Sequence, residues 1–130
     1  MIGGGLTGVE AATEMPVKLR TAFGADTRVR PRVILADRQR WIGSDMGEEA
    51  RAVIDEALTV LDVETRPGVS VAAIDEAGAT LTTGERIAAE TVVWCAGMQA
   101  HPLTARFPVE RDKFGRLSVD TFLKVKGFAA

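Results

Sequence analysis

Three glycines near the start of the chain have the spacing that most clearly indicates a functional site. Gly3, Gly5 and Gly8 match G-x-G-x-x-G, the spacing of a strand-to-helix turn that holds a dinucleotide. In such a turn the first glycine permits the tight bend, the second lets backbone N–H groups approach the pyrophosphate, and the third lets the helix pack closely on its strand. The phosphates would lie at the N-terminus of a helix that begins near Leu6, where backbone donors have no intrahelical partner. Glycine-rich turns are common, so the interpretation depends on the rest of the unit.

An acidic residue at the end of the next predicted strand supplies the second part of the unit. Residues 33–36 are continuously apolar, as in a strand of a parallel sheet that is covered on both faces, and Asp37 ends the run. An acid in this place accepts hydrogen bonds from the adenosine ribose hydroxyls and disfavours a 2′-phosphate, so NAD(H) is favoured over NADP(H). Asp37 lies further along than the usual ~20 residues, a difference that a long first helix and a loop at residues 27–32 can absorb. Arg38 leaves NADP(H) open, because it could pair with a 2′-phosphate.

The other residues with reactive side chains form no catalytic arrangement. Glu10 follows the third glycine by two residues, where it is either a carboxylate favoured by the helix N-terminus or a group beneath the nicotinamide, and the chemistry alone does not separate the two. Cys95 has no second cysteine to pair with and is expected to be a buried, inert thiol, whereas His101 is expected in a solvent-facing loop. No Ser/His/Asp, Cys/His or metal-ligand pattern is present, so no catalytic residue and no metal site are predicted.

Hydrophobic periodicity predicts the elements that must position these residues. A first helix is expected over residues 6–23, with Pro16 kinking or breaking it near Met15, and a second helix over residues 45–61. The strands expected after them are a short one at 63–66, an antiparallel meander at 69–74, 79–81 and 86–87, and a buried strand at 90–97. The predicted fold is α/β: a Rossmann-like three-layer nucleotide-binding domain with a parallel sheet, helices on both faces and an inserted antiparallel β-meander.

Composition indicates one ordinary globular domain. The 130 residues are 46% hydrophobic and 26% charged with a net charge of −2, which gives no reason to expect nucleic acid or an anionic membrane as a partner. One cysteine fits a reducing compartment, and no apolar run approaches the roughly 18 residues that a membrane span needs. A secretory signal is not evident, so the chain is expected to be cytoplasmic.

Both ends of the sequence look cut. Only Met1 and Ile2 precede the first glycine, whereas a strand normally has about five or six residues. We therefore expect the first strand to be truncated and the chain to be part of a larger protein. The sheet edge left open in this way suggests possible self-association, because an unpaired edge is a template for another strand.

Three segments together resemble a known family. Residues 3–10 (Gly-Gly-Gly-Leu-Thr-Gly-Val-Glu), 33–37 (Val-Ile-Leu-Ala-Asp) and 91–97 (Thr-Val-Val-Trp-Cys-Ala-Gly), with the meander between the last two, resemble the NAD(H)-binding domain of the FAD-dependent pyridine nucleotide-disulfide oxidoreductases. Within that family the chain is most similar to type II NADH dehydrogenases, which pass electrons from NADH through FAD to a quinone.

The resemblance implies roles for individual residues. It implies pyrophosphate on Gly5, Leu6 and Thr7 and ribose on Asp37, it favours the functional role for Glu10, and it puts Ala96 and Gly97 beside the nicotinamide. Residues 1–110 would be the NAD(H)-binding domain, and residues 111–130 would begin the return segment to an FAD domain of the parent chain. FAD would be held by that other domain, so this chain alone would not turn over.

Two other functions stay open. FAD-binding domains also begin with G-x-G-x-x-G and end their second strand in an acid, so the chain could be the FAD-binding half of a similar flavoprotein. It could also be a non-catalytic module that keeps the fold for nucleotide binding or for interaction with a partner. The meander followed directly by residues 92–97 favours the NAD(H) half.

Overall fold

The computed structural model describes residues 1–24 and 30–128, which form two compact units, Met1–Ala96 and Gly97–Ala130. The first unit contains α1 (Leu6–Phe23), β1 (Val33–Ala36), a 3-10 turn η1 (Ser44–Met46), α2 (Glu48–Val60), and four further strands, namely β2 (Val63–Arg66), β3 (Val71–Asp75), β4 (Gly78–Leu81) and β5 (Arg86–Ala88). The second contains one 3-10 helix, η2 (Pro102–Arg106). Among the described residues no helix is long and apolar enough to cross a membrane.

Parallel strands form the centre of the first unit. β1 pairs with β2 in parallel, with Val33 opposite Val63 and Ala36 opposite Arg66. Ile2 forms parallel bridges to Ala36 on one side and to Trp94 on the other, so the chain start lies between β1 and the segment 91–95. The sheet therefore continues from β2 through β1 and Met1–Gly3 to residues 91–95.

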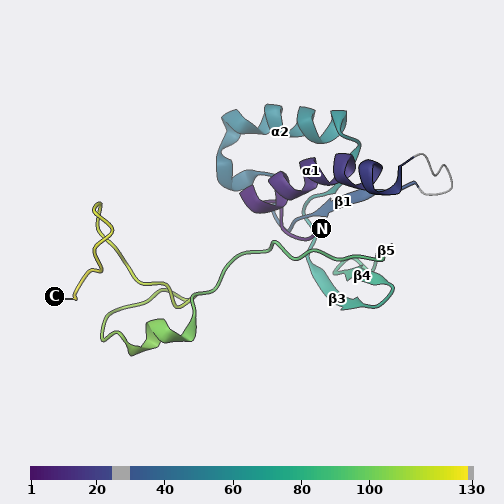
Figure 1. Ribbon diagram of the computed structural model, residues 1–130. Helices are drawn as coiled ribbons and strands as arrows, with labels where there is room; N and C mark the ends of the chain where they lie inside the picture. The colour runs from purple at the N-terminus through teal and green to yellow at the C-terminus, as the bar shows by residue number, and fades with distance from the viewer. Residues whose placement is uncertain (25–29, 129–130) are drawn as a thin grey trace. The chain divides into compact units, whose positions relative to one another are not determined.

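Helices and a second sheet cover the two faces of these strands. Figure 1 shows α1 and α2 beside each other over the parallel strands, with the antiparallel sheet β3–β4–β5 on the other side. The predicted Rossmann-like α/β fold with an inserted meander is confirmed. On the second face, however, the described residues place the antiparallel sheet where a helical layer was expected. The core between α1, α2 and the strands consists of seven buried apolar residues: Ala12, Val33, Leu35, Ile42, Ile54, Leu58 and Val63.

Three details of the elements differ from expectation. α1 runs unbroken through Pro16, so of the expected kink or break near Met15 the break was wrong and the kink stays a prediction. Ala12 and Pro16 are both buried, and this packing holds the helix together at the missing N–H. α2 begins at Glu48 instead of residue 45, because Gly47 has φ +86 and separates it from η1. The expected buried strand at 90–97 is an extended segment in which Trp94 is 60% exposed. Residues 27–29 of the expected loop lie outside the described part of the chain.

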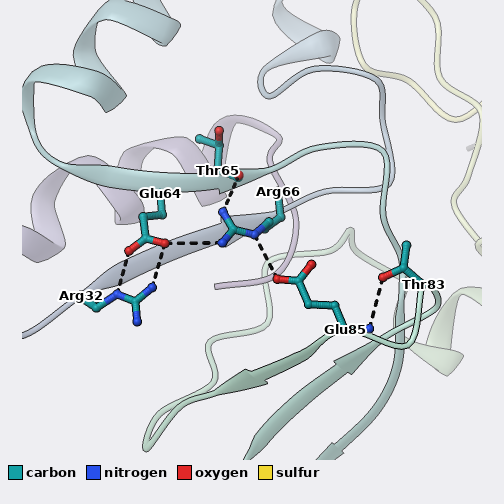
Figure 2. Close-up of polar contacts among 6 residues, drawn as sticks. All are labelled: Arg32, Glu64, Thr65, Arg66, Thr83 and Glu85. Carbon is teal, nitrogen blue, oxygen red and sulfur yellow. Dashed lines mark hydrogen bonds and ion pairs between the residues drawn. The ribbon is translucent and has the colours of Figure 1, made fainter.

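An ion-pair chain links the parallel strands to the antiparallel sheet. Figure 2 shows that Arg32 pairs with Glu64 through two hydrogen bonds of 2.7 and 2.9 Å, and that Arg66 contacts both Glu64, at 3.5 Å, and Glu85, at 3.2 Å. The hydrogen bond from Arg32 holds the pKa of Glu64 below its ordinary value. Such exposed pairs add little stability, but one of them joins Arg66, at the end of β2, to Glu85, directly before β5.

The second unit is made of turns. Asp112 and Asp120 each accept two backbone hydrogen bonds through one carboxylate oxygen, from residues two and four positions ahead. The bridges Arg111–Leu117 and Val119–Val125 enclose these two turns. None of the described residues 97–128 is buried, so this unit has no core of its own.

Candidate functional site

The first position of the turn, Gly3, needs a glycine because the segment that ends at Ala96 passes close beside it. Gly3 has φ +102 and donates its N–H to the Ala36 carbonyl at 2.8 Å. A Cβ on Gly3 would lie 2.6 Å from the Ala96 nitrogen and from the Cys95 carbonyl carbon. Both the backbone conformation and this close approach exclude a larger side chain, so the turn from the first strand into α1 depends on a glycine here.

The third glycine lets α1 lie directly on the turn. A Cβ on Gly8 would lie 1.7 Å from the Gly3 carbonyl oxygen, far inside van der Waals contact. The helix therefore begins against the same peptide that forms the bend. This close packing is the role that the G-x-G-x-x-G spacing assigns to its third glycine.

The second glycine differs from the other two because, among the described residues, no backbone atom of another segment crowds the space beside it. Gly5 is the residue before the first turn of α1 and has φ −74, which any residue can adopt. A Cβ there would have only the Asp45 Oδ2 within 4 Å, at 3.5 Å. Among the described residues no side chain caps the helix, and its first turn carries no acidic residue. Leu6 and Thr7 are exposed at this end, so space and backbone donors occur together.

Asp37 is bound to the glycine turn by a hydrogen bond from Gly4 that the sequence did not indicate. Its half-buried carboxylate accepts the Gly4 N–H through Oδ2 at 2.5 Å and the Gln39 N–H through Oδ1 at 2.6 Å. A Cβ on Gly4 would lie 3.0 Å from both the Asp37 Cβ and the Ile42 Cδ1, so the middle glycine of the run is constrained as well. The run of three glycines was the signal available in the sequence. A carboxylate has about four lone-pair directions, so acceptor capacity remains beyond these two bonds.

The remaining predicted site residues belong to both units of the chain. Glu10 is exposed on the second turn of α1, and Arg38 is exposed directly after Asp37. Ala96 is exposed and is the last residue of the first unit, next to Gly3 through its backbone nitrogen. Gly97, with φ +88, begins the second unit. The first unit thus contains the three glycines, Leu6, Thr7, Glu10, Asp37, Arg38 and Ala96.

Asp45 is the residue near this site that the sequence interpretation missed. It was expected only as the first residue of the second helix, yet its carboxylate is the nearest group to the Cβ position of Gly5. Asp45 lies in η1 and is exposed. A negative charge here is favoured by the positive end of α1 and acts against any second anion that approaches the same helix end.

Comparison with known proteins assigns the family. The family model described as pyridine nucleotide-disulphide oxidoreductase matches residues 1–128. The chain belongs to this family. The expected resemblance is thereby confirmed.

Relatives in the family agree with this assignment. The chain is 54% identical over 130 residues to an NADH dehydrogenase-like protein of Mycobacterium tuberculosis strain H37Rv, an alignment that covers 100% of the chain and 32% of that protein. It is 30% identical over 139 residues to a probable NADH dehydrogenase of Dictyostelium discoideum, covering 99% of the chain and 30% of that protein. The chain thus spans about a third of the length of these curated relatives.

A solved member supports the fold. The crystal structure of reduced Bacillus anthracis CoADR-RHD superposes with a TM-score of 0.67 at 24% identity, over 92% of this chain and 20% of that one. At this identity the likeness concerns the fold alone. It agrees with the parallel strands, the two helices and the antiparallel sheet of the first unit.

Proposed function

We propose that this chain binds NAD(H) at the turn from Gly3 to Gly8 and presents the nicotinamide to FAD held by another part of a longer flavin-dependent NADH oxidoreductase. The observation that carries the proposal is the contrast among the three glycines. A Cβ on the first or the third glycine would clash with backbone atoms. Among the described residues, a Cβ on the second would meet only the Asp45 Oδ2, at 3.5 Å, at a helix end that no side chain caps. A ligand that needs both space and backbone donors explains why a glycine stands at the second position.

The pyrophosphate would bind at the start of α1. The N–H groups of Gly5, Leu6 and Thr7 precede or form the first helical turn, where backbone donors lack intrahelical acceptors, and the helix dipole favours an anion. Leu6 and Thr7 are exposed and leave the approach clear. In this assignment these residues bind the ligand through main-chain atoms, so the identity of their side chains matters less than the absence of one at Gly5.

The adenosine ribose would bind at Asp37. The two backbone hydrogen bonds that this carboxylate accepts hold it in place beside Gly4, and its remaining lone pairs can accept the ribose hydroxyls. A 2′-phosphate would add negative charge next to a fixed carboxylate, so we expect NADH to bind more tightly than NADPH. Arg38 lies close along the chain and is the group that would offset part of this discrimination.

The nicotinamide end would lie towards Glu10, Ala96 and Gly97. Hydride acceptance is the chemistry that FAD would supply when bound, and these residues would orient the nicotinamide and set the electrostatics around it. The ligand would lie across the carboxyl ends of the parallel strands, from the start of α1 to Ala96, which follows the segment 91–95. Residues 111–130 would begin a return segment to an FAD-binding domain, and the lack of buried residues over 97–128 supports that assignment.

Calorimetric titration of the purified chain with NADH, NADPH and FAD in parallel tests the proposal. We expect saturable binding of NADH, weaker binding of NADPH and no binding of FAD. Tighter binding of FAD than of NADH would instead make the chain the flavin-binding half. Absence of binding by all three, in a chain shown to be folded by its circular dichroism, would overturn the assignment of the site.

A further inference from the structure

The turn at residues 66–69 follows β2 and lies beside the end of β1, where Asp37 stands. Asp37 donates its N–H to the Arg66 carbonyl at 3.0 Å, and its own carbonyl accepts the Val69 N–H at 2.9 Å. Both backbone groups of Asp37 are therefore bonded to the turn, one to its first residue and one to its last.

A third hydrogen bond fixes the backbone on the other side of Arg38. The Gly68 N–H donates to the Gln39 carbonyl at 2.7 Å. Gly68 precedes Val69 along the chain, yet it bonds to the later acceptor, so the turn folds over the end of β1. Arg38 thus lies between two residues whose carbonyls both accept hydrogen bonds from the turn 66–69.

The side chain of Asp37 is held as well as its backbone. Its Oδ2 accepts the Gly4 N–H and its Oδ1 accepts the Gln39 N–H. Movement of the carboxylate away from the glycine turn would leave the Gly4 N–H without its charged acceptor. The backbone bonds to the turn 66–69 and these side-chain bonds therefore support the same conformation.

Gly68 sets the shape of the turn without contacting anything else. It has φ +74, and among the described residues a Cβ there would meet no atom within 4 Å. Pro67 before a residue of positive φ is the pattern of a type II turn. The backbone conformation requires a glycine here and the available space does not, so a substitution can alter the turn without pushing atoms into the site.

We propose that the turn 66–69 makes the site selective for an adenosine ribose with a free 2′-hydroxyl, by holding Asp37 and Arg38 in one backbone conformation. This inference rests on the NAD(H) site proposed above. A 2′-phosphate would bind best if the carboxylate moved away and a guanidinium took its place. Arg38 is the exposed cation next to Asp37, but the hydrogen bonds on both sides of it oppose that rearrangement. The residues of the turn act through Asp37 and Arg38 and are positioning residues.

Two substitutions of one glycine test the proposal in the full chain. Valine and asparagine would both place a side chain in open space, but a β-branched residue is an outlier in the left-handed region, whereas asparagine is enriched there. Gly68→Val should therefore open the turn, and Gly68→Asn should keep it. Gly84→Val is the matched control, because Gly84 has φ +87, an equally open Cβ position and an N–H that bonds to Leu81.

Hydrogen exchange of the ligand-free chain reports whether the turn holds Asp37. Exchange of the Asp37 and Val69 amides should be at least about tenfold faster in Gly68→Val than in the unchanged chain, because both hydrogen bonds of Asp37 to the turn open more often. In Gly68→Asn it should stay within about twofold of the unchanged chain. Unchanged exchange at both amides in Gly68→Val would overturn the proposal.

Parallel calorimetric titrations with NADH and NADPH report the selectivity. The NADH-to-NADPH affinity ratio should fall at least about fivefold in Gly68→Val and stay within about twofold of the original in Gly68→Asn and Gly84→Val. In an Arg38→Ala background, Gly68→Val should change the ratio by less than about twofold, because the cation that would pair with the 2′-phosphate is gone.

The outcomes separate this inference from the proposed function. NADH binding with the same ratio in Gly68→Val as in the unchanged chain would overturn the role of the turn and leave the NAD(H) site in place. An equal fall of the ratio in Gly68→Asn, in Gly84→Val or in the Arg38→Ala background would also overturn that role. An unchanged chain that is folded and binds neither nucleotide would overturn both proposals.

Discussion

Alanine at the second glycine should separate ligand binding from folding. A Cβ on Gly5 has a single neighbour within 4 Å, at 3.5 Å, and the residue already has a negative φ. Replacing glycine by alanine at a helix N-cap costs roughly 0.5–1 kcal/mol, so Gly5→Ala should lower the unfolding midpoint by about 2–8 °C. The same methyl group would occupy the space assigned to the pyrophosphate. NADH affinity should therefore fall at least about tenfold, which corresponds to roughly 1.4 kcal/mol.

Alanine at the third glycine should lower the stability of the fold more than alanine at the second glycine does. The Gly8 Cβ would lie 1.7 Å from the Gly3 carbonyl oxygen and 2.9 Å from its carbon, so α1 has to move away from the turn. Overpacking of this kind costs about 1–3 kcal/mol, and the short distance puts Gly8→Ala in the upper half of that range. A gain of up to ~1 kcal/mol in helix propensity offsets part of it. We expect a net loss of about 2 kcal/mol, or a midpoint lower by roughly 8–16 °C.

A glycine far from the site provides the matched control. Gly84 lies in the turn before β5 with φ +87, and a Cβ there would meet no atom within 4 Å. Gly84→Ala should cost about 1–2 kcal/mol through backbone strain alone and leave NADH affinity unchanged. Circular dichroism melts and calorimetric titration of the three variants give both quantities. Wild-type NADH affinity in Gly5→Ala, or wild-type stability in Gly8→Ala, would refute the reasoning about the turn.

Three further predictions concern charged groups. Asp37→Ala should lower the free energy of unfolding by about 1–2 kcal/mol, because the Gly4 N–H loses a charged acceptor. The same change should move the NADH-to-NADPH affinity ratio at least about fivefold towards NADPH. An unchanged ratio in parallel titrations would show that Asp37 does not bind the ribose. Asp45→Asn should strengthen NADH binding by about two- to fivefold at low salt and less at high salt, whereas an equal gain at all salt concentrations would argue against electrostatics. The hydrogen bond from Arg86, with a smaller contribution from the Ala77 N–H, lowers the pKa of Asp75 from 3.8 to about 2. The stability from these contacts is therefore present above pH about 4 and is lost as the pH falls towards 2. NMR titration of the Asp75 carboxyl should show the pKa return towards 3.8 in Arg86→Ala, and an unshifted value in that variant would contradict the assigned cause.

Much of the fold was predictable because local patterns and tertiary packing agree in it. α1, β1 and β2 have the predicted bounds. α1 is a periodic apolar run and β1 a continuously apolar one, whereas the end of β2 is marked by Pro67 and Gly68. The start of α2 was not predictable from periodicity, because the positive φ of Gly47 breaks a pattern that is continuous in the sequence. The unbroken helix at Pro16 depends on packing of α1 against the strands, which helix propensity does not include.

The chemistry of the site was predictable in outline only. The spacing of Gly3, Gly5 and Gly8 indicated the turn. Only the structure shows that a Cβ on Gly3 or Gly8 would clash with backbone atoms, whereas a Cβ on Gly5 would meet one side-chain atom at 3.5 Å. The hydrogen bond from Gly4 to Asp37 joins residues 33 positions apart, so no local sequence pattern encodes it. The bond from Gln39 to Asp37 forms within a local bend. The position of Asp45 beside Gly5 likewise depends on how η1 folds back over the start of α1.

The most direct test of the central claim is a residue-resolved NMR titration of the isotope-labelled chain with NADH. The backbone amides of Gly5, Leu6 and Thr7 should shift together and saturate with a single affinity, along with those of Gly4 and Asp37. Amides of β3–β5 and of residues 111–128 should not move. Saturable binding of NADH that leaves Gly5, Leu6 and Thr7 unshifted would contradict the site, however tight that binding is.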